Sequence, residues 1–151
     1  MKSELAPRSE SAEDRAGAAA VARWPARLVK ASPGVATGAG RGLFAAQAIG
    51  KGEVIDRACT AEIDAEQCLA LDKMHPVGDF YFEHPQDKKL GLMVFGLPSL
   101  CNHRDAPNAD VRFLWEDGLG WVSELYALCD IPAGSEITYR YKTVWFERGD
   151  C

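Results

Sequence analysis

The sequence predicts a single, mainly β domain. Short apolar stretches recur along its second half, separated by glycine, proline, asparagine and aspartate, which is the spacing of short strands and tight turns. In one of these stretches, Val111, Phe113 and Trp115 alternate with Arg112 and Leu114, as in a half-buried strand. Clear signals of a helix start occur in one segment. At 151 residues and 47% hydrophobic composition, the chain can bury one core of this kind.

The expected strands begin near Arg27, where Leu28 and Val29 lead into a turn at residues 32–34, which read Ser-Pro-Gly. Asp117-Gly118 is typical of a tight hairpin turn between two longer strands. The strands expected after the helix are residues 80–82, 90–95, 111–115 and 121–128, and the run EITYRY at 136–141 is expected to form the last one.

The helix signal begins at Asp64. Asp64 is a good N-cap, and Gln67 stands three residues later, where its side chain can reach back to form a capping box. The pair His75-Pro76 is expected to end the helix. Its apolar side is expected to consist of Cys68, Leu69 and Leu71.

Residues 48–55 and 130–137 have similar sequences. The two segments share isoleucine at the second position, glycine at the fifth and isoleucine at the eighth. This pattern suits a tight turn that delivers the chain into a strand. We interpret the segments as two similar turns and not as a repeat architecture.

Composition sets the expected domain limits and location. Residues 1–23 contain almost no large apolar residue and are expected to form a flexible tail, followed by the domain at 24–142 and a short tail at 143–151. No apolar run approaches the roughly 18 residues of a membrane span. Acidic residues near the amino terminus argue against a transit peptide. We therefore expect a cytoplasmic protein that binds neither membranes nor nucleic acid directly.

The cysteines favour free thiols. The chain has five, an odd number, and no two are spaced as a CxxC pair. Disulfides or a zinc site are a poorer interpretation of this pattern than buried or free thiols. We expect no bound metal.

Residues 100–109, LCNHRDAPNA, place several polar groups between two apolar runs. Asn102 and His103 offer amide donors, an amide acceptor and a ring, which suits a polar ligand, and Pro107 stiffens the exit. Taken alone, this segment is better interpreted as an ordinary turn whose asparagines bond their own backbone.

Two further segments change this interpretation. GRGLFA at 40–45 lies upstream and EITYRY at 136–141 lies downstream. In this order and spacing, the three segments resemble the SET-domain protein lysine methyltransferases, over roughly residues 27–141. The family usually reads N-H-S-C-x-P-N where this chain has Arg104 and Asp105 in place of the serine and cysteine. The cysteine is the family's zinc-binding position, so its loss agrees with an absence of zinc.

The resemblance implies a SET-domain fold of small twisted sheets, with one or two short helices and a C-terminal pseudoknot. It also implies S-adenosylmethionine as cofactor, with Tyr141 as the catalytic tyrosine and Tyr139 beside it lining the lysine channel. A strand residue packed on the core is the alternative for either tyrosine. The residues expected to bind the cofactor are Gly40, Arg41, Gly42 and Leu43 through their main chain, Asn102, His103, and Trp145, which with Phe146 is equally an anchor for the C-terminal tail.

The expected activity is transfer of a methyl group from S-adenosylmethionine to a lysine of a protein substrate. Residues 53–87 contain nine acids and two bases, so we expect a target lysine in basic surroundings; a solvated acidic face is the alternative. Tyr81 is a further candidate for the lysine channel, or a plain sheet residue. A non-catalytic SET-like module that binds a basic peptide or partner is the alternative function, favoured by Arg104 and Asp105.

Overall fold

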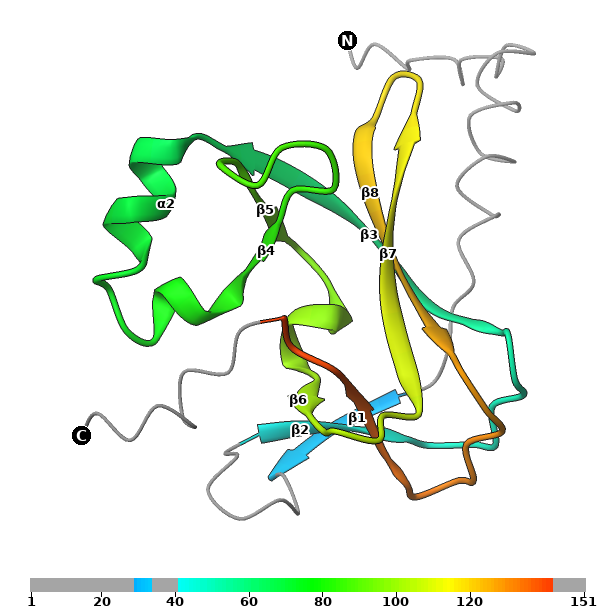
Figure 1. Cartoon of the computed structure of the whole chain (residues 1–151). Coiled ribbons are helices and arrows are strands. Elements are labelled where there is room, and N and C mark those ends of the chain that lie inside the picture. The colour runs from blue at the N-terminus through cyan, green and yellow to red at the C-terminus, as the bar shows by residue number, and fades with distance from the viewer. Residues whose placement is uncertain (1–28, 34–40, 143–151) are drawn as a thin grey trace, which may run out of the picture.

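The computed structural model describes residues 29–33 and 41–142 (Figure 1). Short strands and turns make up most of this part of the chain, so the predicted mainly β fold is confirmed. The strands are β1 (Val29–Pro33), β2 (Arg41–Ala45), β3 (Val54–Ile63), β4 (Tyr81–Glu83), β5 (Gly91–Val94), β6 (Asn102–His103), β7 (Ala109–Glu116), β8 (Gly120–Ala127) and β9 (Glu136–Tyr139). The helices are α2 (Ala65–Leu71) and the 3-10 turns η1 (Val77–Phe80) and η2 (Leu97–Leu100).

The strands form two small sheets. One has five strands in the order β4-β5-β3-β8-β7, all antiparallel, and the other has four in the order β1-β2-β9-β6. In the second sheet, β9 is antiparallel to β2 and parallel to β6. The last strand of the domain therefore lies between two strands from earlier parts of the chain, which is the placement that the expected pseudoknot requires.

Most strand predictions hold, and one turn is wrong. The hairpin at Asp117-Gly118 joins β7 to β8, and Gly118 has a φ of 84°, which favours glycine. The turn expected at residues 32–34, in contrast, is strand as far as Pro33, which pairs with Arg41. β1 is the edge strand of its sheet, and a proline is tolerated at the end of an edge strand because no neighbour needs its missing N–H.

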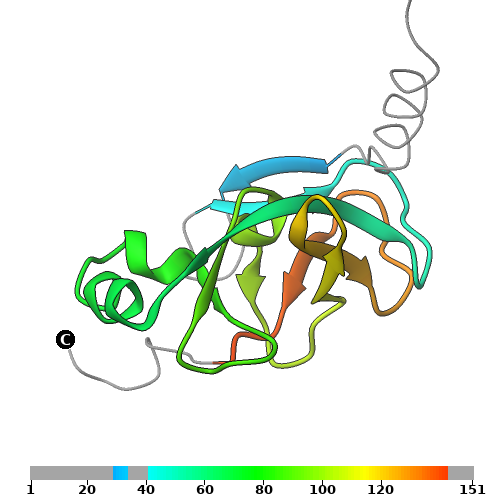
Figure 2. The same ribbon diagram turned by 90° about the horizontal axis from the view of Figure 1, so that it is seen from above.

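The predicted helix start is confirmed. Asp64 accepts a hydrogen bond from the Gln67 backbone N–H (2.8 Å), and the Gln67 side chain accepts one from the Asp64 N–H (2.9 Å). The predicted apolar side holds only in part, because Cys68 and Leu71 are partly buried but Leu69 is 64% exposed. The helix lies at one side of the molecule, where it packs against η1 and not across a sheet (Figures 1 and 2).

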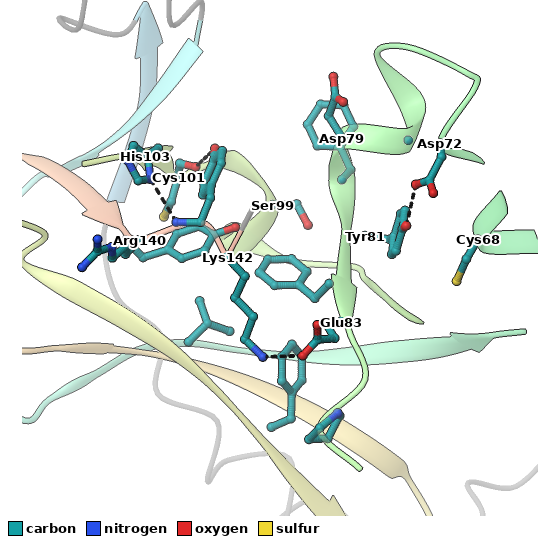
Figure 3. A pocket seen from close by; sticks show the side chains of 18 of the residues that line it. Cys68, Asp72, Asp79, Tyr81, Glu83, Ser99, Cys101, His103, Arg140 and Lys142 are labelled. Atoms are coloured by element: carbon teal, nitrogen blue, oxygen red, sulfur yellow. Dashed lines mark hydrogen bonds and ion pairs between the residues drawn. The ribbon is translucent and has the colours of Figure 1, made fainter. Parts of the chain in front are cut away.

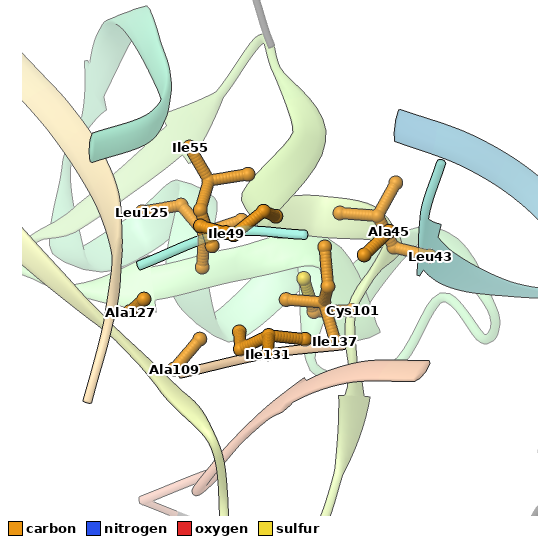
Figure 4. Close-up of a cluster of buried hydrophobic side chains, with 10 residues drawn as sticks. All are labelled: Leu43, Ala45, Ile49, Ile55, Cys101, Ala109, Leu125, Ala127, Ile131 and Ile137. Atoms are coloured by element: carbon orange, nitrogen blue, oxygen red, sulfur yellow. The ribbon is translucent and has the colours of Figure 1, made fainter. Parts of the chain in front are cut away.

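The core lies where the two sheets meet. Figure 4 shows its ten buried side chains, which come from both sheets and from the turns between them: Leu43, Ala45, Ile49, Ile55, Cys101, Ala109, Leu125, Ala127, Ile131 and Ile137. The two segments of similar sequence, 48–55 and 130–137, meet here. The Ile49 N–H donates to the Ile131 carbonyl (2.9 Å), and the Ile131 N–H donates to the Ile49 carbonyl (2.8 Å). Gly52 and Gly134 have φ values of 81° and 82° in the turns that follow.

Candidate active site

Asn102 is fixed by a buried carboxylate. Its amide nitrogen Nδ2 donates to Oε1 of Glu136 over 2.7 Å, from β6 to β9, and both side chains are buried. A Cβ on Gly42 would overlap Glu136 Oε1 and lie 3.0 Å from Asn102 Nδ2. Gly42 is therefore glycine because the chain's own hydrogen-bonded pair occupies the space beside it.

His103 follows Asn102 in β6 and holds the chain that leaves β9. Its ring nitrogen Nδ1 accepts a hydrogen bond from the Tyr141 backbone N–H (3.0 Å), and the two rings meet edge to face with centroids 5.4 Å apart. Because Nδ1 is an acceptor, the proton of the neutral ring resides on Nε2. Nε2 lies 3.3 Å from Oδ1 of Asp105.

Asp105, at the position where the family has a cysteine, therefore contacts the His103 ring through its carboxylate. Its carboxylate is solvent-exposed and faces the protonated ring nitrogen. The other departure, Arg104, is exposed, and its backbone N–H donates to the Tyr139 carbonyl (3.2 Å). Residues 102–104 therefore run alongside β9 although Arg104 and Asp105 differ from the family pattern.

Tyr141 has both its backbone and its hydroxyl held in place. The hydroxyl donates to the Cys101 carbonyl over 2.6 Å (Figure 3). Burial, followed by the neighbouring Cys101 and Asp79, raises the pKa of Tyr141 to about 12. The phenol is therefore neutral at physiological pH, and its oxygen keeps lone pairs for another donor.

Tyr139 lies beside Tyr141, with ring centroids 4.9 Å apart. The prediction that Tyr139 lies beside Tyr141 is confirmed, although Tyr141 lies beyond the end of β9. The Tyr139 ring also stacks on Phe82 of β4 at 5.7 Å. Burial raises the pKa of Tyr139 strongly, and its hydroxyl has no hydrogen-bond partner among residues 29–33 and 41–142.

A cavity of about 1650 Å³ brings these groups together (Figure 3). Asn102, His103, Tyr139 and Tyr141 line one part of it. Phe82 and Phe113, whose rings pack edge to face at 5.6 Å, line the part next to Tyr139.

Tyr81 also lines this cavity, on the side of α2. Its hydroxyl donates to Oδ1 of Asp72 over 2.6 Å, which fixes the ring. Burial is the main cause that raises the pKa of Tyr81, with the Asp72 hydrogen bond second.

The charges around the cavity are mixed. Asp72, Asp79 and Glu83 come from the acidic region 53–87, but Lys142 pairs with Glu83 at 3.0 Å across the cavity (Figure 3). The remaining charged residues of the lining are Asp110, Lys88, Lys89, Arg112 and Arg140, together with His75.

The other residues expected to bind a cofactor are placed differently. Leu43 is a core residue whose main chain lies between β1 and β9, and Arg41 begins β2. Gly40 and Trp145, with Phe146, lie outside the described residues. Within the described part of the chain, no three His, Cys, Asp or Glu side chains group as a metal site would require, and no helix is long and apolar enough to cross a membrane.

Sequence reasoning missed two residues of the site. Glu136 begins the EITYRY run and holds Asn102, as described above. Asn108 ends the 102–108 motif and bonds the backbone of β9 twice: Nδ2 donates to the Glu136 carbonyl (2.8 Å), and Oδ1 accepts from the Thr138 N–H (2.9 Å). The retained Pro-Asn pair was a signal for Asn108, but nothing near Glu136 in the sequence indicated its partner.

The family of the chain follows from a match to the SET-domain model over residues 40–142. The chain therefore belongs to the SET-domain family. The match lies inside the expected domain at 24–142. It covers all of the residues that line the cavity.

Individual relatives agree with this membership. The chain is 35% identical over 107 residues to the mouse histone-lysine N-methyltransferase NSD3; the matched region is 68% of this chain and 7% of that protein. A candidate histone methyltransferase of Plasmodium falciparum superposes with a TM-score of 0.60 at 24% identity, over 81% of this chain and 98% of that one. ctPRC2 bound to S-adenosylmethionine gives 0.67 at 20% identity, over 78% and 15%. The two solved structures establish the likeness of fold.

Proposed function

We propose that this chain transfers a methyl group from S-adenosylmethionine to a lysine side chain of a protein. The observation that carries the proposal is the convergence of Tyr141, Tyr139, Asn102 and His103 on one cavity that is walled by aromatic rings. The names of the relatives support it, because NSD3 is a histone-lysine N-methyltransferase and a similar structure is bound to S-adenosylmethionine.

The chemistry requires a neutral lysine. With an unperturbed pKa of about 10.4, only about one amine in a few thousand is neutral at pH 7, a handicap of roughly 4 to 5 kcal/mol. The rings of Phe82, Phe113 and Tyr139 exclude water from the channel and so disfavour the ammonium form. The oxygen of Tyr141, held by the Cys101 carbonyl, accepts a hydrogen bond from the amine and orients it.

The residues present fit the cofactor. When bound, S-adenosylmethionine supplies the methyl group on a sulfonium. Asn102 and His103 would hold its amino acid and adenine ends, next to Tyr141 and on the same cavity. The phenol of Tyr141 is neutral and can orient an amine beside the sulfonium while its own O–H stays hydrogen-bonded to the Cys101 carbonyl.

The direct test uses two measurements on the folded protein. Calorimetry with S-adenosylmethionine tests cofactor binding, and labelled cofactor with a cell lysate, read by mass spectrometry, tests methylation. Tyr126→Phe is a matched control, because this tyrosine does not line the cavity. We expect binding and lysine methylation that Tyr126→Phe leaves unchanged. Folded protein without cofactor binding would favour the alternative, a non-catalytic module that binds a basic peptide or partner.

We further propose a substrate lysine in basic surroundings. Asp72, Asp79 and Glu83 line the cavity on the side of α2 and β4 and would attract basic residues of a peptide. Raising the salt concentration from low to physiological should therefore weaken peptide binding much more than cofactor binding. Salt-insensitive peptide binding would favour a solvated acidic face. The same lining also contains basic residues, namely Lys88, Lys89, Arg112, Arg140 and Lys142, so either result is possible.

A further inference from the structure

Glu136 is a buried carboxylate with one oxygen used and one unused. It is 8% exposed, and Oε1 accepts the 2.7 Å hydrogen bond from Asn102. The second oxygen, Oε2, is buried and has no hydrogen-bond partner among the described residues. Buried carboxylates are normally compensated by a cation or by several donors. Glu136 therefore holds an acidic charge beside the cavity that one amide only partly satisfies.

This carboxylate fixes the orientation of the Asn102 amide. An ionised carboxylate can only accept hydrogen bonds, so the amide must present its NH₂ group to Glu136. The oxygen Oδ1 lies at the other end of the planar amide, and Asn102 lines the cavity. An amide whose nitrogen donates to a carboxylate is polarised, which makes its oxygen a stronger acceptor.

Gly42 completes the arrangement. It lies against the hydrogen-bonded pair, and any larger residue would push Glu136 away from Asn102. The three residues come from β2, β6 and β9. Together they give Asn102 an acceptor oxygen on an amide whose nitrogen is bound to a carboxylate. A primary ammonium group is the ligand chemistry that such an acceptor selects.

We propose that Glu136 is a positioning residue that orients the Asn102 amide to bind the amino group of S-adenosylmethionine, and that its charge complements that ammonium through the amide. This inference rests on the proposed function. It assigns to Glu136 a role beyond tying β6 to β9, and the two roles differ in one measurable respect. An amide-orienting carboxylate affects only ligands that carry the amino group, whereas a tie between strands affects every ligand of the cavity.

The test is a binding comparison with two ligands and one variant. Calorimetry is performed with S-adenosylhomocysteine, which has the amino group, and with methylthioadenosine, which lacks the whole amino acid portion. In Glu136→Gln the side chain can donate as well as accept, so the Asn102 amide is free to turn over. We expect affinity for S-adenosylhomocysteine to fall about 10- to 100-fold, the range for loss of a charge-assisted hydrogen bond. Affinity for methylthioadenosine should change less than about twofold.

An analogue of S-adenosylhomocysteine with hydrogen in place of the amino group sharpens the comparison. The wild type should bind this analogue more weakly than S-adenosylhomocysteine, and Glu136→Gln should bind the two nearly equally. Equal losses for all three ligands would overturn the inference and leave the strand-tying role. If the wild type, properly folded, binds none of them, the proposed function fails, and this inference fails with it.

A second variant covers the case in which Glu136→Gln does not fold. Glu136→Asp keeps a carboxylate but shortens it by one methylene, so it draws the acceptor away from Asn102. The same selective loss for S-adenosylhomocysteine over methylthioadenosine is expected. Thermal unfolding of each variant is measured alongside. An Asp variant that loses affinity equally for both ligands at unchanged stability would count against the inference.

Discussion

The ring nitrogen Nδ1 of His103 accepts a hydrogen bond from the backbone N–H of Tyr141, over 3.0 Å. The two residues are 38 positions apart in the chain. Tyr141 lies beyond the end of β9, so sheet pairing does not hold its backbone. The imidazole therefore accepts the hydrogen bond that a neighbouring strand would otherwise accept from the Tyr141 N–H. His103 thus positions the tyrosine in addition to lining the cavity.

Substitution of His103 should consequently affect Tyr141. His103→Ala removes the acceptor for the Tyr141 N–H, and we expect kcat to fall roughly 100-fold because the tyrosine loses its position. His103→Asn places an amide oxygen near the original Nδ1 and should recover part of that loss. Steady-state kinetics of both variants on one peptide check this. Equal losses in the two variants would show that the acceptor is not what matters.

Tyr141→Phe removes the hydroxyl while leaving the backbone hydrogen bond to His103. We expect cofactor affinity to stay nearly intact and most turnover to disappear, because the hydroxyl acts in the transition state more than in cofactor binding. Calorimetry and single-turnover kinetics separate the two effects. Tyr126→Phe serves as the control for removal of a tyrosine hydroxyl outside the cavity. Unchanged turnover in Tyr141→Phe would remove the tyrosine from its proposed role.

Alkaline pH should destabilise the protein. The pKa of Tyr141 is raised to about 12 and those of Tyr81, Tyr126 and Tyr139 are also raised, chiefly by burial. Above about pH 10 the unfolded chain loses these phenol protons while the folded chain keeps them, so the free energy of unfolding falls as pH rises from about 10 towards 12. Thermal unfolding between pH 8 and 11 measures this. Tyr141→Phe should be less sensitive, and an identical slope in the variant would contradict the assignment.

Asn108 should be worth more to stability than an ordinary turn residue. Asn108→Ala removes both hydrogen bonds to the backbone of β9 and leaves the Glu136 carbonyl and the Thr138 N–H without that partner. We expect a loss of about 2 to 4 kcal/mol in the free energy of unfolding. Asn108→Asp retains the acceptor for Thr138 but sets a carboxylate oxygen against the Glu136 carbonyl, so it should not recover the loss. Urea unfolding with an unchanged m-value provides the measurement, and a loss below about 0.5 kcal/mol in Asn108→Ala would show that water replaces the amide.

The sequence predicted those features that depend on neighbouring residues. The capping box of Asp64 and Gln67 spans four positions, and the proximity of Tyr139 and Tyr141 depends on residues only two positions apart. The pairing of Glu136 with Asn102 could not be predicted in this way, because it depends on the register of β9 against β2 and β6. The exposure of Leu69 could not be predicted for a related reason, because burial of a helix residue depends on which elements pack against the helix.

Tyr139→Phe should change the number of methyl groups added. Tyr139 lines the cavity and its hydroxyl has no hydrogen-bond partner among the described residues, so we expect the hydroxyl to bind the amine or a water beside it. Such a bond restricts rotation of the amine and occupies space that a second or third methyl group needs. We therefore expect mono- or dimethylation by the wild type and a shift towards higher methylation in Tyr139→Phe.

The comparison requires product masses from both proteins on one peptide at long incubation, so that slow turnover is not mistaken for a limit on methylation. Phe keeps the stacking of residue 139 on Phe82, so the variant isolates the hydroxyl from the packing of the ring. Identical product distributions at good activity would assign Tyr139 to the aromatic packing of the cavity alone. A higher methylation state in the variant would place its hydroxyl next to the substrate amine.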